Sequence, residues 1–189
     1  GLIATALHDQ GKLNGDTVVA TVMSNLGLER YLQNYGMRLE RTAVGDRYVV
    51  EKMRENGFNF GGEQSGHIIL GDANTTGDGL IAALQILSVI IQDKRPVSEI
   101  CHVFDPVPQI LRNMRYSKPI SITEGRVSNA ITEAEKMVEG QGRILVRQSG
   151  TEPLIRVMAE GDDTKIVDKA VAYICDAITA EDEQQKQAI

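Results

Sequence analysis

The segment Thr17-Val-Val-Ala-Thr-Val-Met23 decides the fold class of the first half of the chain. Its β-branched residues follow one another with few polar breaks, a pattern typical of a strand that is covered on both faces, as in a parallel sheet. Apolar residues at helical spacing precede it over residues 2–10 and follow it over residues 28–35, after a Ser24-Asn25 cap. A second strand is expected over residues 38–44.

Strands and helices continue to alternate as far as residue 93. A helix capped by Asp46 is expected to end at Asn56-Gly57, and short strands are expected over residues 58–61 and 67–70. A longer helix is expected over residues 80–93. Its apolar residues recur at helical spacing: Leu80, Ala83, Leu84, Leu87 and Ile91. This alternation predicts a three-layer α/β domain.

The composition changes where four prolines fall close together. They are Pro96, Pro106, Pro108 and Pro119. Proline is excluded from helix interiors and favours extended connectors, so we place a domain boundary here, between domains over residues 1–104 and 108–189.

The second domain shows a different order of elements. Strands are expected over residues 109–116, 143–147 and 154–160, with a helix over residues 127–139. A closing helix carries apolar residues on one face: Val167, Val171, Ile174 and Ile178. The pattern predicts a small α+β domain with an antiparallel sheet and helices.

Composition excludes several classes of protein. The chain has 189 residues and a net charge of −6, without the basic surplus that nucleic-acid binding requires. No apolar run reaches the ~20 residues of a membrane-spanning helix, and no secretory signal is visible. Cys101 and Cys175 match no metal or redox spacing, which favours reduced thiols in the cytoplasm. The first residue is Gly rather than Met, so we expect the chain to be the later part of a longer protein.

The loop Arg147-Gln-Ser-Gly-Thr-Glu-Pro153 lies between two expected strands. Hydroxyl groups, backbone N–H groups in a turn and a forked guanidinium are the donors that bind a phosphate. Arg156, on the following strand, is a weaker candidate for the same ligand. The alternative interpretation is a plain hairpin, because Ser, Gly and Thr are common turn residues.

A second polar loop, Gly61-Gly-Glu-Gln-Ser-Gly-His67, combines a carboxylate, a hydroxyl and an imidazole between glycines. Glu63 and Ser65 could bind the hydroxyl groups of a polyol, and His67 could transfer a proton near neutral pH. The alternative is a solvated connection whose glycines only permit positive φ. In a third loop, residues 43–48, Asp46 is best explained as a helix N-cap. No nucleophile motif, P-loop or metal-ligand cluster is visible.

Together, these loops resemble the motifs of the α-D-phosphohexomutase family. Thr42-Ala-Val-Gly-Asp-Arg-Tyr48 and Asn74-Thr-Thr-Gly-Asp-Gly79 narrow the resemblance to bacterial members that act on glucosamine phosphates. The resemblance covers essentially the whole chain, in the right order and spacing. It is confined to the third and fourth of the family's four domains.

The resemblance implies that the first domain binds the sugar and the second binds the phosphate. His67 would assist proton transfer. Asp46 stands where more distant members have His, so no proton transfer is assigned to it. The implied sugar-binding residues are Gly45, Asp46, Glu63 and Ser65, and the implied phosphate-binding residues are Arg147, Ser149, Gly150, Thr151 and Arg156.

The implied reaction is an isomerisation of glucosamine 6-phosphate and glucosamine 1-phosphate, through a phosphoserine and a bisphosphate intermediate, in the supply of cell-wall precursors. The phosphoserine and the Mg²⁺ ligands belong to the family's first two domains. We therefore expect this chain alone to be inactive, with a phosphosugar and the missing amino-terminal half as its partners. The alternatives are a member that acts on mannose or glucose phosphates, or a non-catalytic phosphosugar-binding module.

Overall fold

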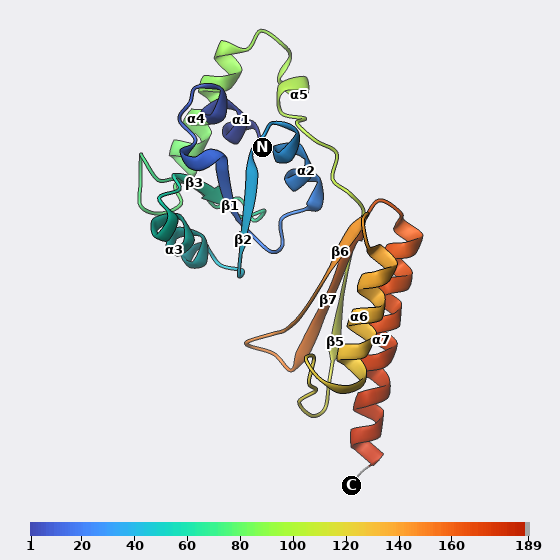
Figure 1. Ribbon diagram of the computed structural model, residues 1–189. Helices are drawn as coiled ribbons and strands as arrows, with labels where there is room; N and C mark the ends of the chain where they lie inside the picture. The colour runs from blue at the N-terminus through green and yellow to red at the C-terminus, as the bar shows by residue number, and fades with distance from the viewer. Residues whose placement is uncertain (188–189) are drawn as a thin grey trace. The chain divides into compact units, whose positions relative to one another are not determined.

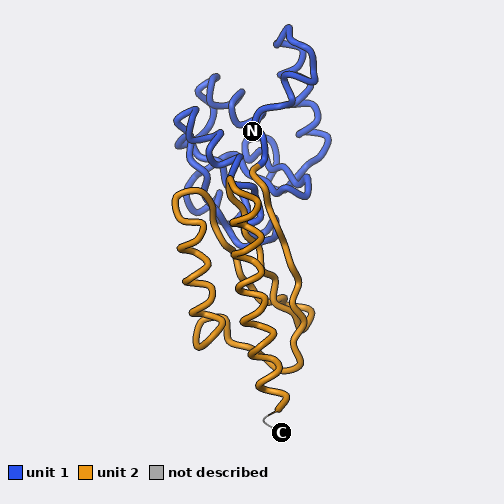
Figure 2. Tube along the Cα trace, turned by 90° about the vertical axis from the view of Figure 1, so that its right-hand side faces the viewer, with its two compact units in different colours: residues 1–106 blue, residues 107–189 orange. Residues whose placement is uncertain are grey.

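The structure of the chain, a computed structural model, describes residues 1–187. It contains two compact units, Gly1–Pro106 and Val107–Ile189 (Figure 2).

The first unit is built on a four-stranded sheet in the order β2-β1-β3-β4 (Figure 1). β1 pairs in parallel with both β2 and β3, while β3 and β4 are antiparallel. All residues of β1 are buried, as the run of β-branched residues predicts. The strands are β1 (Thr17–Thr21), β2 (Arg38–Thr42), β3 (Phe60–Gly62) and β4 (Ile68–Leu70).

Helices cover both faces of this sheet. Val18 packs in a cluster with residues of α1, α2 and α4, whereas its neighbour Val19 packs in another cluster with Val49 and Met53 of α3. Successive residues of a strand point to opposite faces, so these two clusters give the three layers that the sequence predicts. The helices are α1 (Leu2–Asp9), α2 (Leu26–Asn34), α3 (Asp46–Asn56), α4 (Gly79–Gln92) and α5 (Val97–Ile100), with a 3₁₀ turn over Asn14–Asp16.

Two local features differ from the sequence analysis. The N-cap position of α3 is Gly45, and Asp46 is the first helical residue rather than the cap. In α4, the expected helix forms, but its apolar residues Leu80, Leu84, Leu87 and Ile91 are exposed. The helix packs instead through Ala82, which is buried, and Ile86. No residue of α4 is charged, so the sequence could not indicate which face packs.

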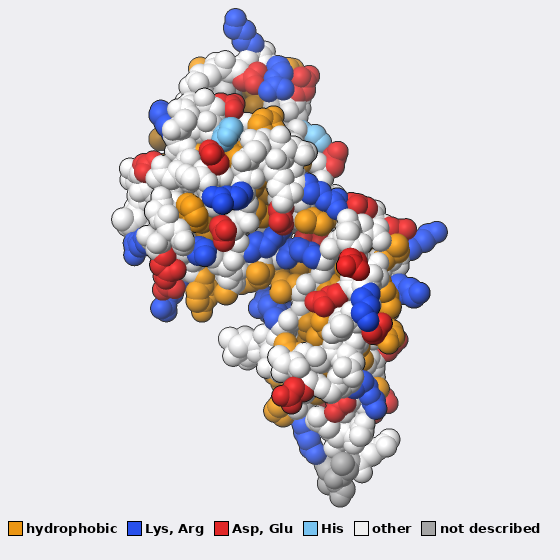
Figure 3. Space-filling model, viewed as in Figure 1, with side chains coloured by type: hydrophobic (Ala, Val, Ile, Leu, Met, Phe, Trp, Pro, Cys, Tyr) orange, Lys and Arg blue, Asp and Glu red, His pale blue; other side chains and the backbone are white. Residues whose placement is uncertain are grey.

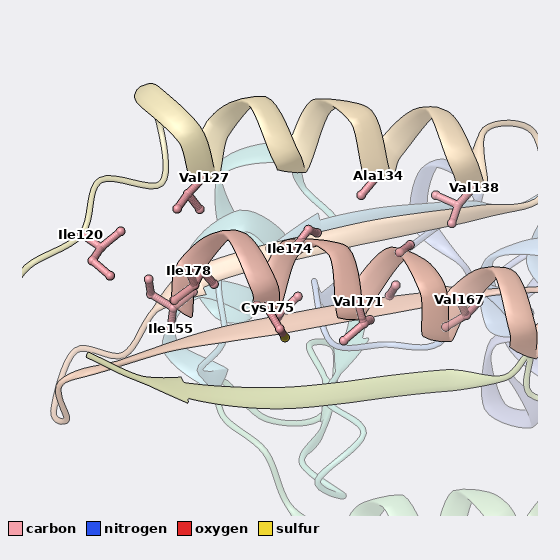
Figure 4. Close-up of a cluster of buried hydrophobic side chains, with 13 residues drawn as sticks. Ile120, Val127, Ala134, Val138, Ile155, Val167, Val171, Ile174, Cys175 and Ile178 are labelled. Atoms are coloured by element: carbon pink, nitrogen blue, oxygen red, sulfur yellow. The ribbon is translucent and has the colours of Figure 1, made fainter. Parts of the chain in front are cut away.

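The second unit is an antiparallel sheet in the order β5-β7-β6 with two helices on one face. Figure 4 shows side chains of both helices packed between the helix layer and the sheet, among them Val127, Val171 and Ile174. This confirms the predicted α+β arrangement. The elements are β5 (Gln109–Arg115), α6 (Gly125–Val138), β6 (Gly142–Gln148), β7 (Leu154–Gly161) and α7 (Thr164–Gln187).

The segment after β5 is fixed to the end of α7 by one carboxylate. Asp182 Oδ1 accepts a hydrogen bond from the Ser117 backbone N at 2.6 Å, and Oδ2 pairs with Lys186 Nζ. The Lys186 ammonium and the Ser117 N–H hold the pKa of Asp182 below its ordinary value. Three residues after Ser117 lies Ile120, which is 1% exposed and belongs to the core of the unit.

The surface of each unit carries both acidic and basic side chains on the face shown in Figure 3. Of the two cysteines, neither is in a disulfide: Cys101 is exposed and Cys175 is buried. Across residues 1–187, none of the helices has both the length and the apolar character needed to cross a bilayer.

We predict that Asp182→Asn lowers the Tm of the second unit at pH 7. Because folding lowers the pKa of Asp182, its stabilisation is present above the unfolded pKa of about 4 and is lost as the pH falls through the folded pKa. The Tm difference between the two proteins should therefore shrink towards pH 2. Thermal unfolding from pH 7 to pH 2 measures it. Asp176→Asn, at an exposed position of the same helix, is the control, and an equal Tm loss in both variants would contradict the assignment.

Candidate functional site

The loops after β2 and β3 start at the same edge of the sheet in the first unit. Both strands run parallel to β1, so their carboxyl ends lie at one edge. Ligands of open α/β sheets gather at this edge. The topology therefore brings the 43–48 loop next to the Gly61–His67 loop. The sequence alone indicated both loops but not that they are neighbours.

The Gly61–His67 loop is a tight connection between antiparallel strands. The Glu63 N–H donates to the His67 carbonyl at 2.8 Å, and the Gly66 N–H donates to the Glu63 carbonyl at 3.1 Å. Gly66 has φ +99°, a conformation that residues with a Cβ rarely adopt. The loop thus presents Glu63, Ser65 and His67 from a defined backbone.

Glu63 joins the two loops. Its Oε1 accepts a hydrogen bond from the backbone N of Gly45 at 3.0 Å, and its side chain is only 10% exposed. The carboxylate thereby fixes the turn between β2 and α3. Asp46, by contrast, is exposed, and its Oδ1 accepts from the Arg47 backbone N at 2.8 Å. Of the expected sugar-binding residues, Gly45 and Glu63 are in contact, and Asp46 adds an exposed carboxylate beside them.

His67 is held by one ring nitrogen. Its Nδ1 lies 3.0 Å from Ser65 Oγ and 3.8 Å from Glu63 Oε2. Its Nε2 has no hydrogen-bond partner among residues 1–187, and the side chain is 58% exposed. Since Nδ1 is occupied, Nε2 is the atom that can exchange a proton with a bound molecule.

In the second unit, the Arg147–Pro153 loop connects β6 and β7. The Ser149 N–H donates to the Leu154 carbonyl at 2.9 Å, and the Thr151 N–H lies 3.5 Å from Ser149 Oγ. Ser149 is half-buried, and Gly150 and Thr151 are exposed. The loop is thus a closed hairpin end in which the Ser149 N–H is already used, while Gly150 and Thr151 are exposed.

Arg147 and Arg156 lie directly opposite each other on β6 and β7. Within the described part of the chain, neither guanidinium is paired with a carboxylate. Burial and then the charge of Arg156 lower the pKa of Arg147. In addition, the Nε of Arg156 is buried and makes no hydrogen bond. Like charges opposite each other in a sheet destabilise it, so this pair is suited to share an anion.

Gln148, to which the sequence analysis gave no role, anchors the same loop. Its Nε2 donates to the Ile120 carbonyl at 2.7 Å, and the Tyr116 N–H donates to the Pro153 carbonyl at 3.3 Å. Both ends of the loop are thereby fixed to the segment after β5. No spacing in the sequence signals this contact, because Ile120 lies in an irregular segment.

Acidic and imidazole side chains do not gather into a metal centre. Among residues 1–187, no group of three or more His, Cys, Asp or Glu side chains could hold a metal ion.

Two family models match the chain. One is described as phosphoglucomutase/phosphomannomutase, alpha/beta/alpha domain III, and matches residues 1–107. The other is the C-terminal domain of the same enzymes and matches residues 93–177. The chain belongs to the phosphoglucomutase/phosphomannomutase family, the α-D-phosphohexomutases.

Relatives within the family are close in sequence. A phosphoglucosamine mutase of Azorhizobium caulinodans is 55% identical over 177 residues, which are 94% of this chain and 40% of that protein. One of Novosphingobium aromaticivorans is 58% identical, with the same two shares. The chain thus spans well under half the length of these curated relatives.

Solved structures show the same fold at low sequence identity. An Aspergillus fumigatus N-acetylphosphoglucosamine mutase matches with a TM-score of 0.76 and 18% identity, covering 96% of this chain and 42% of that one. A structure of the same fungal enzyme in complex with GlcNAc-6P and magnesium has a TM-score of 0.75 and 16% identity, covering 94% and 45%. These likenesses confirm the fold.

We predict that Gly66→Ala destabilises the first unit by about 1–2 kcal/mol, because a Cβ is strained at this positive φ. Urea unfolding of the first unit measures the change. Gly79→Ala, in the same unit, is the matched control: its Cβ would also meet open space, but its φ is not in the positive region. A loss no greater for Gly66→Ala than for Gly79→Ala would contradict the geometry of the Gly61–His67 loop.

Proposed function

We propose that the chain is the sugar- and phosphate-binding part of a phosphoglucosamine mutase. The identity to curated phosphoglucosamine mutases supports this assignment over other members of the family. In this proposal the domain over residues 1–104 binds the sugar and the domain over residues 108–189 binds the phosphate. The observation that carries it is the unpaired Arg147–Arg156 couple beside a loop of hydroxyl and amide donors.

The phosphate site consists of two guanidiniums and one hairpin end. Arg147 and Arg156 supply the charge, and a phosphate between them would give the buried Nε of Arg156 the hydrogen bond that it lacks. The hydroxyl groups of Ser149 and Thr151 and the N–H of Gly150 would add donors for the other oxygens. An anion there also relieves the repulsion between the two opposite guanidiniums.

The sugar site consists of the two loops that Glu63 joins. One carboxylate oxygen of Glu63 accepts from Gly45, which leaves the other to accept from a sugar hydroxyl. Ser65 and Asp46 are exposed polar groups of the same two loops. These side chains would contact hydroxyl groups of the sugar rather than one face of its ring. The sugar could therefore bind with either its C1 end or its C6 end towards the phosphate site.

His67 is proposed to receive the proton of the attacking sugar hydroxyl on Nε2, with Ser65 holding Nδ1. In the whole enzyme, a phosphoserine would transfer its phosphoryl group to that hydroxyl, giving a bisphosphate, and then regain a phosphoryl group from the other end. The phosphoserine would come from beyond this chain. Magnesium appears in the fungal complex, and its ligands would likewise come from beyond this chain, since residues 1–187 show no group of three or more His, Cys, Asp or Glu side chains that could hold a metal ion.

The two free cysteines, without a disulfide, support a place in the reducing cytoplasm. There the product would enter amino-sugar metabolism and the synthesis of cell-wall precursors.

We predict that Arg147→Ala weakens the binding of glucosamine 6-phosphate about 10- to 100-fold, because a charge-assisted bidentate contact contributes roughly 1.5–3 kcal/mol. Isothermal titration of the 189-residue chain measures it. Arg126→Ala, an exposed arginine that contacts Gln184 on α7, is the control. If both variants bind like the parent, the Arg147–Pro153 loop is only a hairpin. Mannose and glucose 6-phosphates in the same titration separate a glucosamine enzyme from one that acts on hexoses.

We also predict that the chain alone does not interconvert glucosamine 6-phosphate and glucosamine 1-phosphate, even with the bisphosphate and Mg²⁺. The physical reason is that the described residues lack a metal cluster and the sequence shows no nucleophile motif. Phosphorus NMR of the mixture over several hours checks it. Product formed in proportion to the amount of chain would show that the chain is catalytically complete.

A further inference from the structure

Helix α4 carries an apolar stripe that faces solvent. The fractional exposures are 79% for Leu80, 66% for Leu84, 51% for Leu87 and 81% for Ile91. These four residues, here called the α4 stripe, recur every three or four positions and therefore form one face along the whole helix. They are large hydrophobic residues, and together they form a patch rather than scattered exposed side chains.

The opposite side of α4 is the one that packs. Ala82 is buried, and Ile86 contacts the cluster formed by α1, α2 and the sheet. Asp78 caps the helix by accepting hydrogen bonds from the N–H groups of Leu80 and Ile81. The exposed stripe therefore lies on a helix whose first turn is stabilised by an N-cap. A helix on the surface of a soluble protein usually has a polar outer face, and α4 has no charged residue on either face. The α4 stripe is thus a surface that needs a partner.

The size of the stripe favours a tethered partner over a second copy of the chain. At roughly 60–120 Å² of apolar area per large side chain, the four residues expose on the order of 300 Å². A stable dimer buries about 800 Å² on each side. A covalently linked domain does not lose the translational freedom that a free partner loses, so a small apolar contact is sufficient to hold it.

The relatives provide a candidate for that tethered partner. The chain spans only 40% of the Azorhizobium caulinodans protein, and the matched family models are the third and the C-terminal domains. More than half of the relative therefore lies outside the match, and the numbering of the models places it ahead of residue 1.

We propose that the α4 stripe is the docking surface for the domains that precede this chain in a full-length mutase. This inference rests on the proposed function only in assuming that the chain is part of a full-length mutase. The surface that it contacts is apolar, because the stripe offers no charge or hydrogen-bond donor beyond the side chains of Gln85 and Ser88 nearby. Docking removes the stripe from water and fixes the first unit to the rest of the enzyme.

Thiol accessibility tests the proposal without measuring activity. Leu84→Cys is made in a Cys101→Ser background, in the 189-residue chain and in a fusion that adds the preceding part of the Caulobacter vibrioides phosphoglucosamine mutase, which is 57% identical over the matched region. We expect maleimide labelling to be at least tenfold slower in the fusion. Tyr173→Cys, exposed on α7, is the control and should react equally in both proteins.

Each other result overturns the proposal. Equal labelling of the Leu84→Cys variant in both proteins means that the preceding domains do not cover the stripe. Labelling of the shorter chain that slows as its concentration rises means that a second copy covers it. If the fusion does not fold, the cysteine is placed at the aligned position of the intact Caulobacter protein, where rapid labelling would equally contradict the proposal. Loss of phosphosugar binding in Arg147→Ala is independent of all these outcomes.

Discussion

The complete burial of β1 is the constraint on which the first unit depends. Val18 and Val19 point to opposite faces, and each needs a helix layer above it, so the strand can lie only in the interior of a sheet. Its parallel neighbours β2 and β3 then end at one edge. The two polar loops meet there, and the Glu63 to Gly45 hydrogen bond follows from that meeting. The burial of a single short strand thus sets the geometry of a candidate sugar site.

In the second unit, the register of the antiparallel sheet, rather than the meeting of two loops, forms the candidate site. This sheet fixes Arg147 opposite Arg156 through backbone register alone, whatever the repulsion between their charges. The packing of three strands against α6 and α7 supplies the stability that tolerates this repulsion. Such stored electrostatic cost is typical of a binding site that is prepared for its ligand before the ligand arrives.

Much of this was predictable from the sequence, because periodicity and turn residues act locally. The burial of β1, the antiparallel pairing of β6 with β7 and the helix at α4 follow from residue patterns. Three features did not. The packed face of α4 was hidden because the whole helix is uncharged, the cap of α3 shifted from Asp46 to Gly45, and the Gln148 to Ile120 contact joins segments 28 positions apart. These depend on tertiary packing, which a single sequence shows only through a resemblance.

The carboxylate of Asp182, near the end of α7, is connected through hydrogen bonds to the loop that follows β6. It holds the amide of Ser117, three residues before Ile120, whose carbonyl in turn holds Gln148 at the entrance of the Arg147–Pro153 loop. Two hydrogen bonds therefore link the last turns of the final helix to the strand that carries Arg147. A carboxyl-terminal extension or truncation of this protein therefore alters the helix end whose contacts lead to the anchor of the Arg147–Pro153 loop.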